Sequence, residues 1–262
     1  MLITSKLKSL YLPLHIKWFN TMTDNLIGMG ISDNIIEPDE NVTEQMQQEL
    51  SSLQNRLAGM PEGSDDLARN RLLLDIATLL IAMDRKNEAW DIARPLFDAF
   101  IAAASWQDAV ETCDILYAAD QDESIIALGN GVWLAVTFPV DPALSTNMLD
   151  HVIEETPSDS DGGAVAAATA HYLADLRATD EKMRESLGFL TGNLLASVAF
   201  RHSNLKEREM IDMWVERLEL NQPEKFLPRL GMMLQLIVGD HWWIDREALR
   251  DVLPDDANSY AE

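Results

Sequence analysis

The sequence contains a single cysteine, Cys113, in 262 residues, so it cannot form a disulfide within the chain. A chain without disulfides suits a reducing compartment, and we expect a cytoplasmic location. Cys113 lies on the apolar face of a predicted helix, where a small core residue is expected rather than a nucleophile. No apolar run approaches the roughly 20 residues that a membrane-spanning helix requires, so no membrane span is expected.

Lysine and arginine are absent from residues 95–175, which hold fourteen acidic residues. This segment supplies −14 of the chain's net charge of −24. Such a field disfavours direct binding to nucleic acid and would attract a basic protein partner. The alternatives are an acidic face that only keeps the chain soluble and a mimic of nucleic-acid charge. The acidic candidates for partner binding are Asp108, Glu111, Asp114, Asp120, Asp122 and Glu123.

Signatures of serine and cysteine nucleophiles, phosphate-binding loops and paired-cysteine zinc sites are also missing. His151 precedes Glu155, and His171 precedes Asp175, by four residues, which predicts ion pairs or solvated side chains on helix surfaces. Together these four side chains could instead offer ligands to a metal. A helical enzyme or a metal or cofactor binder is therefore the alternative function. The sequence favours a non-enzyme and identifies no catalytic, cofactor-binding or metal-binding residue.

Apolar residues recur at helical spacing through residues 71–138 and predict two helical hairpins. Asp65 or Ser64 is expected to cap the helix that opens the first hairpin, and Asn87 is expected to cap its second helix with a side-chain oxygen. Leu73 and Trp106 are 33 residues apart, and Asn87 and Gln121 are 34 apart. This period is typical of stacked helical hairpins.

These hairpins resemble the tetratricopeptide repeat. Trp106 lies where that family often has an aromatic residue, whereas Ala77 and Leu80 replace the family's glycine and tyrosine, and the first unit lacks the closing proline. The resemblance covers about a quarter of the chain and implies a scaffold that presents a concave surface to peptides or partner proteins. The residues at the family's packing positions are Leu73, Ala77, Leu80, Ala89 and Ala93.

The whole chain is predicted to be all-α, with about ten helices forming a solenoid or a compact helical array of stacked hairpins. Residues 1–42 are expected to be irregular, 43–253 to form the helical-repeat domain, and 254–262 to be a polar tail. Residues 138–163 could hinge two halves, or the domain could be continuous. Residues 1–22 mix lysines with aromatic residues; a flexible tail, or a true start at Met22, is favoured over a surface anchor.

Two further features carry predictions about packing. Gly188 and Gly192 lie four residues apart in a predicted helix and suggest close contact with a neighbouring backbone. Trp242 and Trp243 follow a predicted helix stop at Gly239, where they either seal the end of the stack or form a docking patch. Sealing is favoured, but both tryptophans remain candidates for partner binding. We therefore predict an adaptor, assembly factor or chaperone that engages a basic or helical protein partner.

Overall fold

The computed structural model describes residues 40–61, 63, 65–251 and 253. The chain divides into two compact units, Met1–Thr43 and Glu44–Glu262. The predictions for residues 1–22 and for the tail at 254–262 lie outside the described residues, as does nearly all of the predicted irregular segment 1–42.

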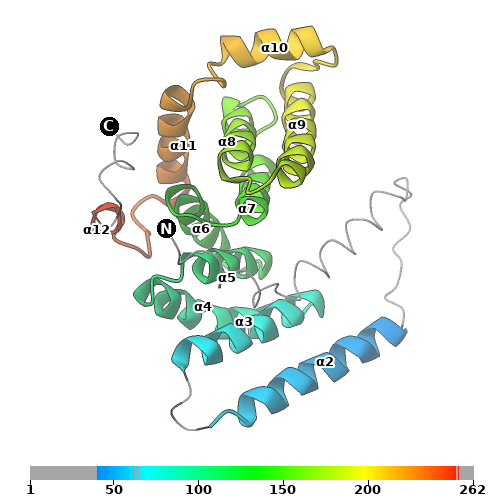
Figure 1. Ribbon diagram of the computed structural model, residues 1–262, viewed down its shortest axis with the longest axis vertical. Helices are drawn as coiled ribbons and strands as arrows, with labels where there is room; N and C mark the ends of the chain where they lie inside the picture. The colour runs from blue at the N-terminus through cyan, green and yellow to red at the C-terminus, as the bar shows by residue number, and fades with distance from the viewer. Residues whose placement is uncertain (1–39, 62, 64, 252, 254–262) are drawn as a thin grey trace. The chain divides into compact units, whose positions relative to one another are not determined.

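Eleven helices and no strand are found in the described part of the chain (Figure 1). From α3 to α9 each helix packs against the next, in the manner of stacked hairpins. The predicted all-α architecture of stacked hairpins is therefore confirmed. The helices are α2 (Glu40–Ala58), α3 (Asp66–Ala82), α4 (Lys86–Ala102), α5 (Trp106–Ala118), α6 (Ser124–Thr137), α7 (Pro142–Glu155), α8 (Asp161–Arg177), α9 (Glu181–Ser203), α10 (Arg208–Arg217), α11 (Pro223–Val238) and α12 (Arg246–Arg250).

The turns that follow α3, α4 and α5 share one backbone device. Asp84, Ala104 and Asp120 adopt φ values of 55°, 50° and 55° at these three helix ends. This left-handed conformation ends a helix by folding the next amide back onto a free carbonyl. After α3, for example, the Arg85 N–H donates to the Leu80 carbonyl at 2.8 Å.

Side-chain caps explain where several helices begin. Asp65 caps α3 by accepting from the Leu67 N–H at 3.1 Å, as predicted. The predicted cap at Asn87 is wrong, because α4 already begins at Lys86 and Asn87 lies inside its first turn. The preceding left-handed turn, rather than a side chain, sets the start of α4.

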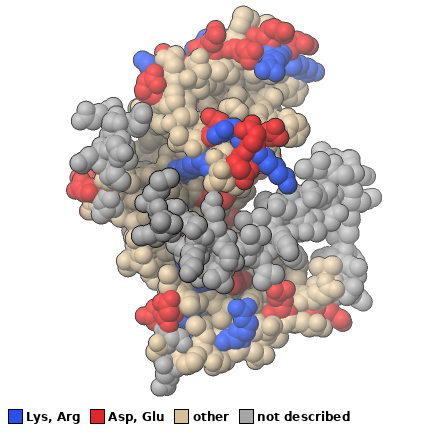
Figure 2. Space-filling view, viewed as in Figure 1, with Lys and Arg blue, Asp and Glu red and all other residues tan. Residues whose placement is uncertain are grey.

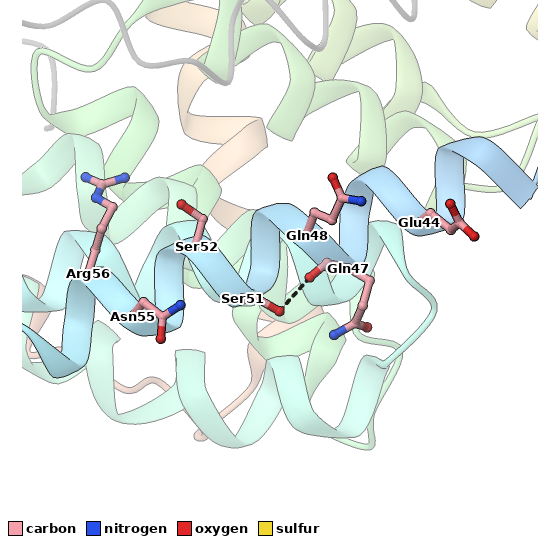
Figure 3. Close-up of a pocket in the computed structure, with 7 residues that line it drawn as sticks. All are labelled: Glu44, Gln47, Gln48, Ser51, Ser52, Asn55 and Arg56. Carbon is pink, nitrogen blue, oxygen red and sulfur yellow. Dashed lines mark hydrogen bonds between the residues drawn. The ribbon is translucent and has the colours of Figure 1, made fainter.

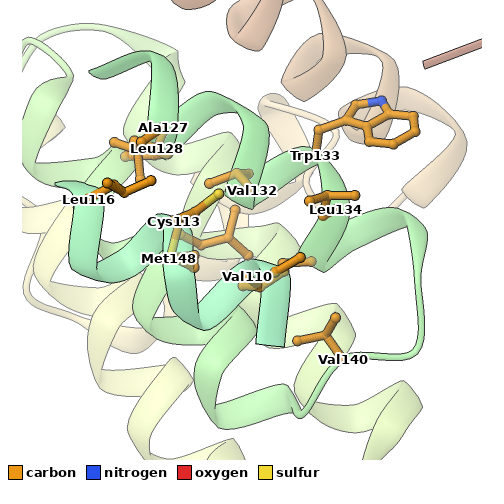
Figure 4. Packing of buried hydrophobic residues seen from close by; sticks show 14 of the residues in the cluster. Val110, Cys113, Leu116, Ala127, Leu128, Val132, Trp133, Leu134, Val140 and Met148 are labelled. Atoms are coloured by element: carbon orange, nitrogen blue, oxygen red, sulfur yellow. The ribbon is translucent and has the colours of Figure 1, made fainter. Parts of the chain in front are cut away.

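Helix α6 lies at the centre of the core and packs against α5, α7 and α11. Every residue from Ala127 to Ala135 is buried, which is expected of a helix that is apolar on all sides. Cys113 of α5 and Met148 of α7 approach Gly131 so closely that a β-carbon there would lie 2.6 and 2.5 Å from their atoms. Figure 4 shows these side chains packed among their apolar neighbours, so Cys113 is a core residue as predicted.

The C-terminal part of the chain covers helices from several hairpins. We call residues 223–244, comprising α11 and the segment that follows it, the C-terminal strap. Helix α11 packs against α8 and α6. Beyond it, the backbone N–H of Trp243 donates to the side-chain oxygen of Asn130 in α6 at 3.2 Å. The Trp243 ring packs against the Phe97 ring of α4, with centroids 5.3 Å apart. The strap therefore contacts α8, α6 and α4, the second helices of three successive hairpins.

Candidate functional site

The acidic segment at residues 95–175 acquires some of its counter-charges from other parts of the chain. Asp108, one of the predicted partner-binding acids, is buried and accepts from Arg71 Nε at 2.8 Å and Ser105 Oγ at 2.5 Å. Glu111 is half-buried and accepts from Gln107 at 2.8 Å. Asp108 thereby links α5 to Arg71 of α3 and is withdrawn from the accessible surface, whereas Glu111 bonds to Gln107 of its own helix.

Asp114 joins α5 to α7 through a histidine. Its carboxylate lies 3.0 Å from His151 Nε2 and accepts from Asn147 at 3.1 Å. Glu154 lies 3.6 Å from the other ring nitrogen of His151. Burial lowers the pKa of His151, but the hydrogen bonds and charges of Asp114 and Glu154 outweigh it, so the pKa is raised overall.

The C-terminal ends of α5 and α7 lie side by side. Tyr117, near the end of α5, donates its hydroxyl to Glu155, the last residue of α7, at 2.7 Å. Its ring also meets that of His151, with centroids 4.6 Å apart. Burial, followed by the hydrogen bond and charge of Glu155, raises the pKa of the Tyr117 hydroxyl. The turns that follow α5 and α7 therefore share one edge of the helical stack.

We call the exposed carboxylates of these two turns and helix ends the acidic edge. Lys86, 3.5 Å from Asp120, and Arg201, which donates to the Ile153 carbonyl at 2.9 Å, are bases that approach this edge. Burial, followed by the charge of Glu154, raises the pKa of nearby Asp150. The acidic edge consists of Asp120, Asp122, Glu123, Glu154, Glu155 and Asp159.

Helix polarity adds to the negative potential of this edge. The C-terminal end of a helix carries a partial negative charge, and cations in its last turn are stabilising. Neither α5 nor α7 has a basic residue in its last turn, and α7 ends with two glutamates. By contrast, Figure 2 shows acidic and basic side chains side by side over α10, whose surface is mixed in charge.

Neither predicted histidine–carboxylate ion pair forms among the described residues, so that alternative is wrong, whereas His171 is exposed, as the solvated alternative expected. His151 contacts Asp114 and Glu154, whereas Glu155 binds Tyr117. In the second case His171 contacts Thr191 of α9 at 2.8 Å. The partner of Asp175 is likewise on the neighbouring helix, with Arg184 Nε at 3.1 Å. Apart from Glu154, which lies on the same helix as His151, the partners come from neighbouring helices and replace the residues expected four positions away.

Trp242 and Trp243 are half-buried and have partners within the fold. Trp243 packs edge-on against Phe97 and carries the Arg94 guanidinium 4.0 Å above its ring. The Arg246 guanidinium lies 3.8 Å from the Trp242 ring, and the indole N–H donates to Gln235. These contacts agree with the favoured interpretation that the tryptophans seal the helical stack.

A polar hollow lies along α2 (Figure 3). All of its lining residues belong to this one helix, and Ser51 Oγ donates to the Gln47 carbonyl at 2.9 Å. A single helix does not enclose a substrate or converge polar groups on a reacting atom. The lining residues are Glu44, Gln47, Gln48, Ser51, Ser52, Asn55 and Arg56.

Arg177 makes a cluster of hydrogen bonds to backbone carbonyls that the sequence did not predict. Its guanidinium is mostly withdrawn from solvent and donates to the carbonyls of Ala135, Val136 and Val140, at 2.7, 3.0 and 3.2 Å. Burial lowers its pKa. Arg177 thus has a structural role, because it satisfies free carbonyls at the end of α6 and just beyond it. Its one signal in the sequence is that it is the first basic residue after the acidic segment.

Among the described residues, no group of three or more histidine, cysteine, aspartate or glutamate side chains is arranged to hold a metal ion. None of the helices in the described ranges is long and apolar enough to cross a membrane. Comparison of the chain with protein-family models, with curated proteins and with solved structures gave no match.

Proposed function

We propose that this chain is a non-enzymatic scaffold that binds a basic protein partner through the acidic edge, as an adaptor, assembly factor or chaperone does. The observation that carries the proposal is the meeting of two acidic helix ends, joined by the contact between Tyr117 and Glu155. Like charges placed side by side cost folding free energy, and a basic partner would remove that cost.

The accessible acids form a smaller set than the sequence indicated. Asp108 and Asp114 are held by Arg71 and His151, whereas Asp122 and Glu123 are exposed and have no ion pair within the described residues. Glu154, Glu155 and Asp159 extend the same surface from the other turn. We therefore assign partner binding to the acidic edge and no longer to Asp108, Glu111, Asp114 or the two tryptophans.

The hairpin repeat supports a scaffold of the tetratricopeptide type. The 33- and 34-residue spacings fall in the hairpins α3–α4 and α5–α6, which pack in sequence. A stack of hairpins displays its turns in a row along each edge, so acids in successive turns act as one surface. Such a surface offers charge to a partner without a closed pocket.

Salt-dependent capture tests the proposal. Immobilised protein is exposed to native lysate at low ionic strength, and retained proteins are eluted with a salt gradient and identified by mass spectrometry. Because the Debye length falls from about 10 Å at 0.1 M salt to about 3 Å at 1 M, a partner held by charge should elute sharply. A partner retained equally at both ends of the gradient contradicts the proposal, and competition by DNA for that partner would favour the charge mimic instead.

A further inference from the structure

The strap contacts its neighbours as a bound amphipathic helix would. Helix α11 buries four apolar residues at successive intervals of four, an unbroken stripe along one side of the helix. Phe226 packs edge-on against Tyr172 of α8, with ring centroids 6.0 Å apart. The stripe consists of Phe226, Leu230, Leu234 and Val238.

The surface beneath this stripe is shaped for close approach by a helix. A β-carbon placed at Gly129 of α6 would lie 2.2 Å from a γ-methyl of Val238, and one at Gly162 of α8 would lie 2.9 Å from the sulfur of Met233. At Gly129 the neighbour is a stiff β-branched side chain, so the approach requires glycine, whereas at Gly162 the flexible Met233 side chain could shift. Because α4 continues the same side of the stack and holds Trp243, the second helices of three hairpins together form a groove, which we call the second-helix groove.

The strap is joined to the stack by a weakly packed connection. Helix α10, which leads into it, packs on α9 and has Trp214 as its buried residue. The hairpins from α3 to α9 pack in sequence on one another, so the strap is an addition to that series and not a link within it. Polar contacts between the strap and the hairpins are also few in the described part of the chain: Arg229 pairs with Asp161 at 3.0 Å, the backbone N–H of Trp243 donates to Asn130, and the Arg94 guanidinium lies over the Trp243 ring.

We propose that the second-helix groove is a binding site for an amphipathic partner helix, and that the C-terminal strap occupies it within the same chain until such a helix displaces it. The strap itself defines the ligand: a helix of about four turns with large apolar residues at every fourth position, followed by an aromatic residue. This inference does not depend on the acidic edge, and either can fail without the other.

A disulfide staple tests whether the strap must leave. A β-carbon at Gly129 would lie 3.7 Å from the β-carbon of Val238, within the range of roughly 3.5–4.5 Å found in disulfides. In the full chain carrying Gly129→Cys and Val238→Cys, the second substitution removes the γ-methyl that the first would strike. Oxidation then fixes the strap in the groove, and reduction frees it.

The probe is a fluorescent peptide with the strap's own sequence, residues 221–245, whose binding is followed by anisotropy. We expect the oxidised staple to bind it at least about tenfold more weakly than the reduced protein, because occupancy of the groove lowers apparent affinity in proportion to the free fraction. Equal binding in the two states overturns the proposal. A cross-link between two chains on a non-reducing gel also overturns it, because the groove would then hold the strap of a second copy.

Matched variants on one helix give an independent test. Leu230→Ala, or the milder Val238→Ala, weakens the strap without altering the groove and should tighten probe binding about tenfold. Leu236 is 86% exposed on the same helix, so Leu236→Ala should leave binding at the wild-type value. If neither the reduced staple nor the weakened variants bind the probe, the groove is only the seat of a core helix and the proposal fails.

Discussion

Adding one methyl group at Gly129 should destabilise the fold, although the same change elsewhere should stabilise it. Gly129 lies inside α6, where replacing glycine with alanine ordinarily gains about 1 kcal/mol. Here the new β-carbon would lie 2.2 Å from a methyl of Val238, a stiff β-branched side chain that is 1% exposed. Overpacking of this kind costs about 1–3 kcal/mol, so after the propensity gain we expect a net loss of up to about 2 kcal/mol for Gly129→Ala.

The partner residue supplies the decisive comparison. Val238→Ala removes the methyl, and the two β-carbons would then be 3.7 Å apart, an ordinary contact. In the Val238→Ala background, Gly129→Ala should therefore stabilise by about 1 kcal/mol, a reversal of sign. Gly188→Ala on α9 is the control, because nothing lies within 4 Å of a β-carbon there. It should stabilise by about 1 kcal/mol in either background.

Urea unfolding of the four proteins of this cycle, with Gly188→Ala alongside, measures these changes as shifts in midpoint at constant slope. A change of 1 kcal/mol also moves the melting temperature by about 2–4 °C in a unit of this size. If Gly129→Ala stabilises the wild-type chain as Gly188→Ala does, then α11 does not pack on α6, and the second-helix groove is wrong.

Three further predictions concern single side chains. The pKa of His151 is raised in the folded state, so its protonated ring stabilises the fold below its ordinary pKa of about 6.5, and this contribution is lost as pH rises through the folded value. The loss of unfolding free energy caused by His151→Gln should therefore be larger at about pH 6 than at about pH 9. Urea titrations that give the same loss at both pH values would contradict this prediction. Burial raises the pKa of the Cys113 thiol, so a thiol reagent should label it only in denaturant, and rapid labelling of the native protein would show that α5 is not packed as described. Arg177→Met leaves the carbonyls at the end of α6 without their donor and should cost about 2–3 kcal/mol in unfolding free energy, whereas Arg208→Met, at a side chain that is 92% exposed, should cost almost nothing.

The sequence predicted the features that depend on near neighbours in the chain. Helical periodicity is set by spacings of three and four residues, and the cap at Asp65 acts on an amide two residues away. The burial of Cys113 follows from its place on such an apolar face. The stacking of hairpins follows because short connections leave consecutive helices adjacent.

Features that depend on distant parts of the chain were predicted poorly. Gly188 and Gly192 were expected to meet a neighbouring backbone, yet nothing lies within 4 Å of a β-carbon at either position, so that prediction is wrong. Neighbouring side chains instead approach closely at Gly129, Gly131, Gly162 and Gly163. Which glycine allows close packing is decided by the elements that cross it, here α11 at Gly129 and both α5 and α7 at Gly131, and no local spacing encodes those crossings.

The candidate site shows the same division between local and distant information. Charge composition located the acidic segment, but it could not show that Arg71 withdraws Asp108 from the surface or that His151 holds Asp114. It also could not show that the ends of α5 and α7 meet through Tyr117. The acidic edge therefore emerges only when the fold brings two turns together.

The binding affinity of the captured basic partner for two matched triple variants tests the central claim most directly. Asp122→Asn, Glu123→Gln and Asp159→Asn neutralise exposed carboxylates of the acidic edge and leave the pairs of Glu154 and Glu155 intact. The control variant neutralises Glu209, Glu216 and Glu224, which are exposed on α10 and α11. Each variant removes three negative charges and changes the net charge from −24 to −21.

At low salt we expect the edge variant to bind the partner about tenfold more weakly, since exposed charge pairs contribute about 0.2–1 kcal/mol each. The control variant should bind as the wild type does, and the difference should shrink at high salt. Equal weakening of both variants would show that only total charge matters. Unchanged affinity of the edge variant would show that the partner binds elsewhere, and either result contradicts the acidic edge as the partner-binding surface.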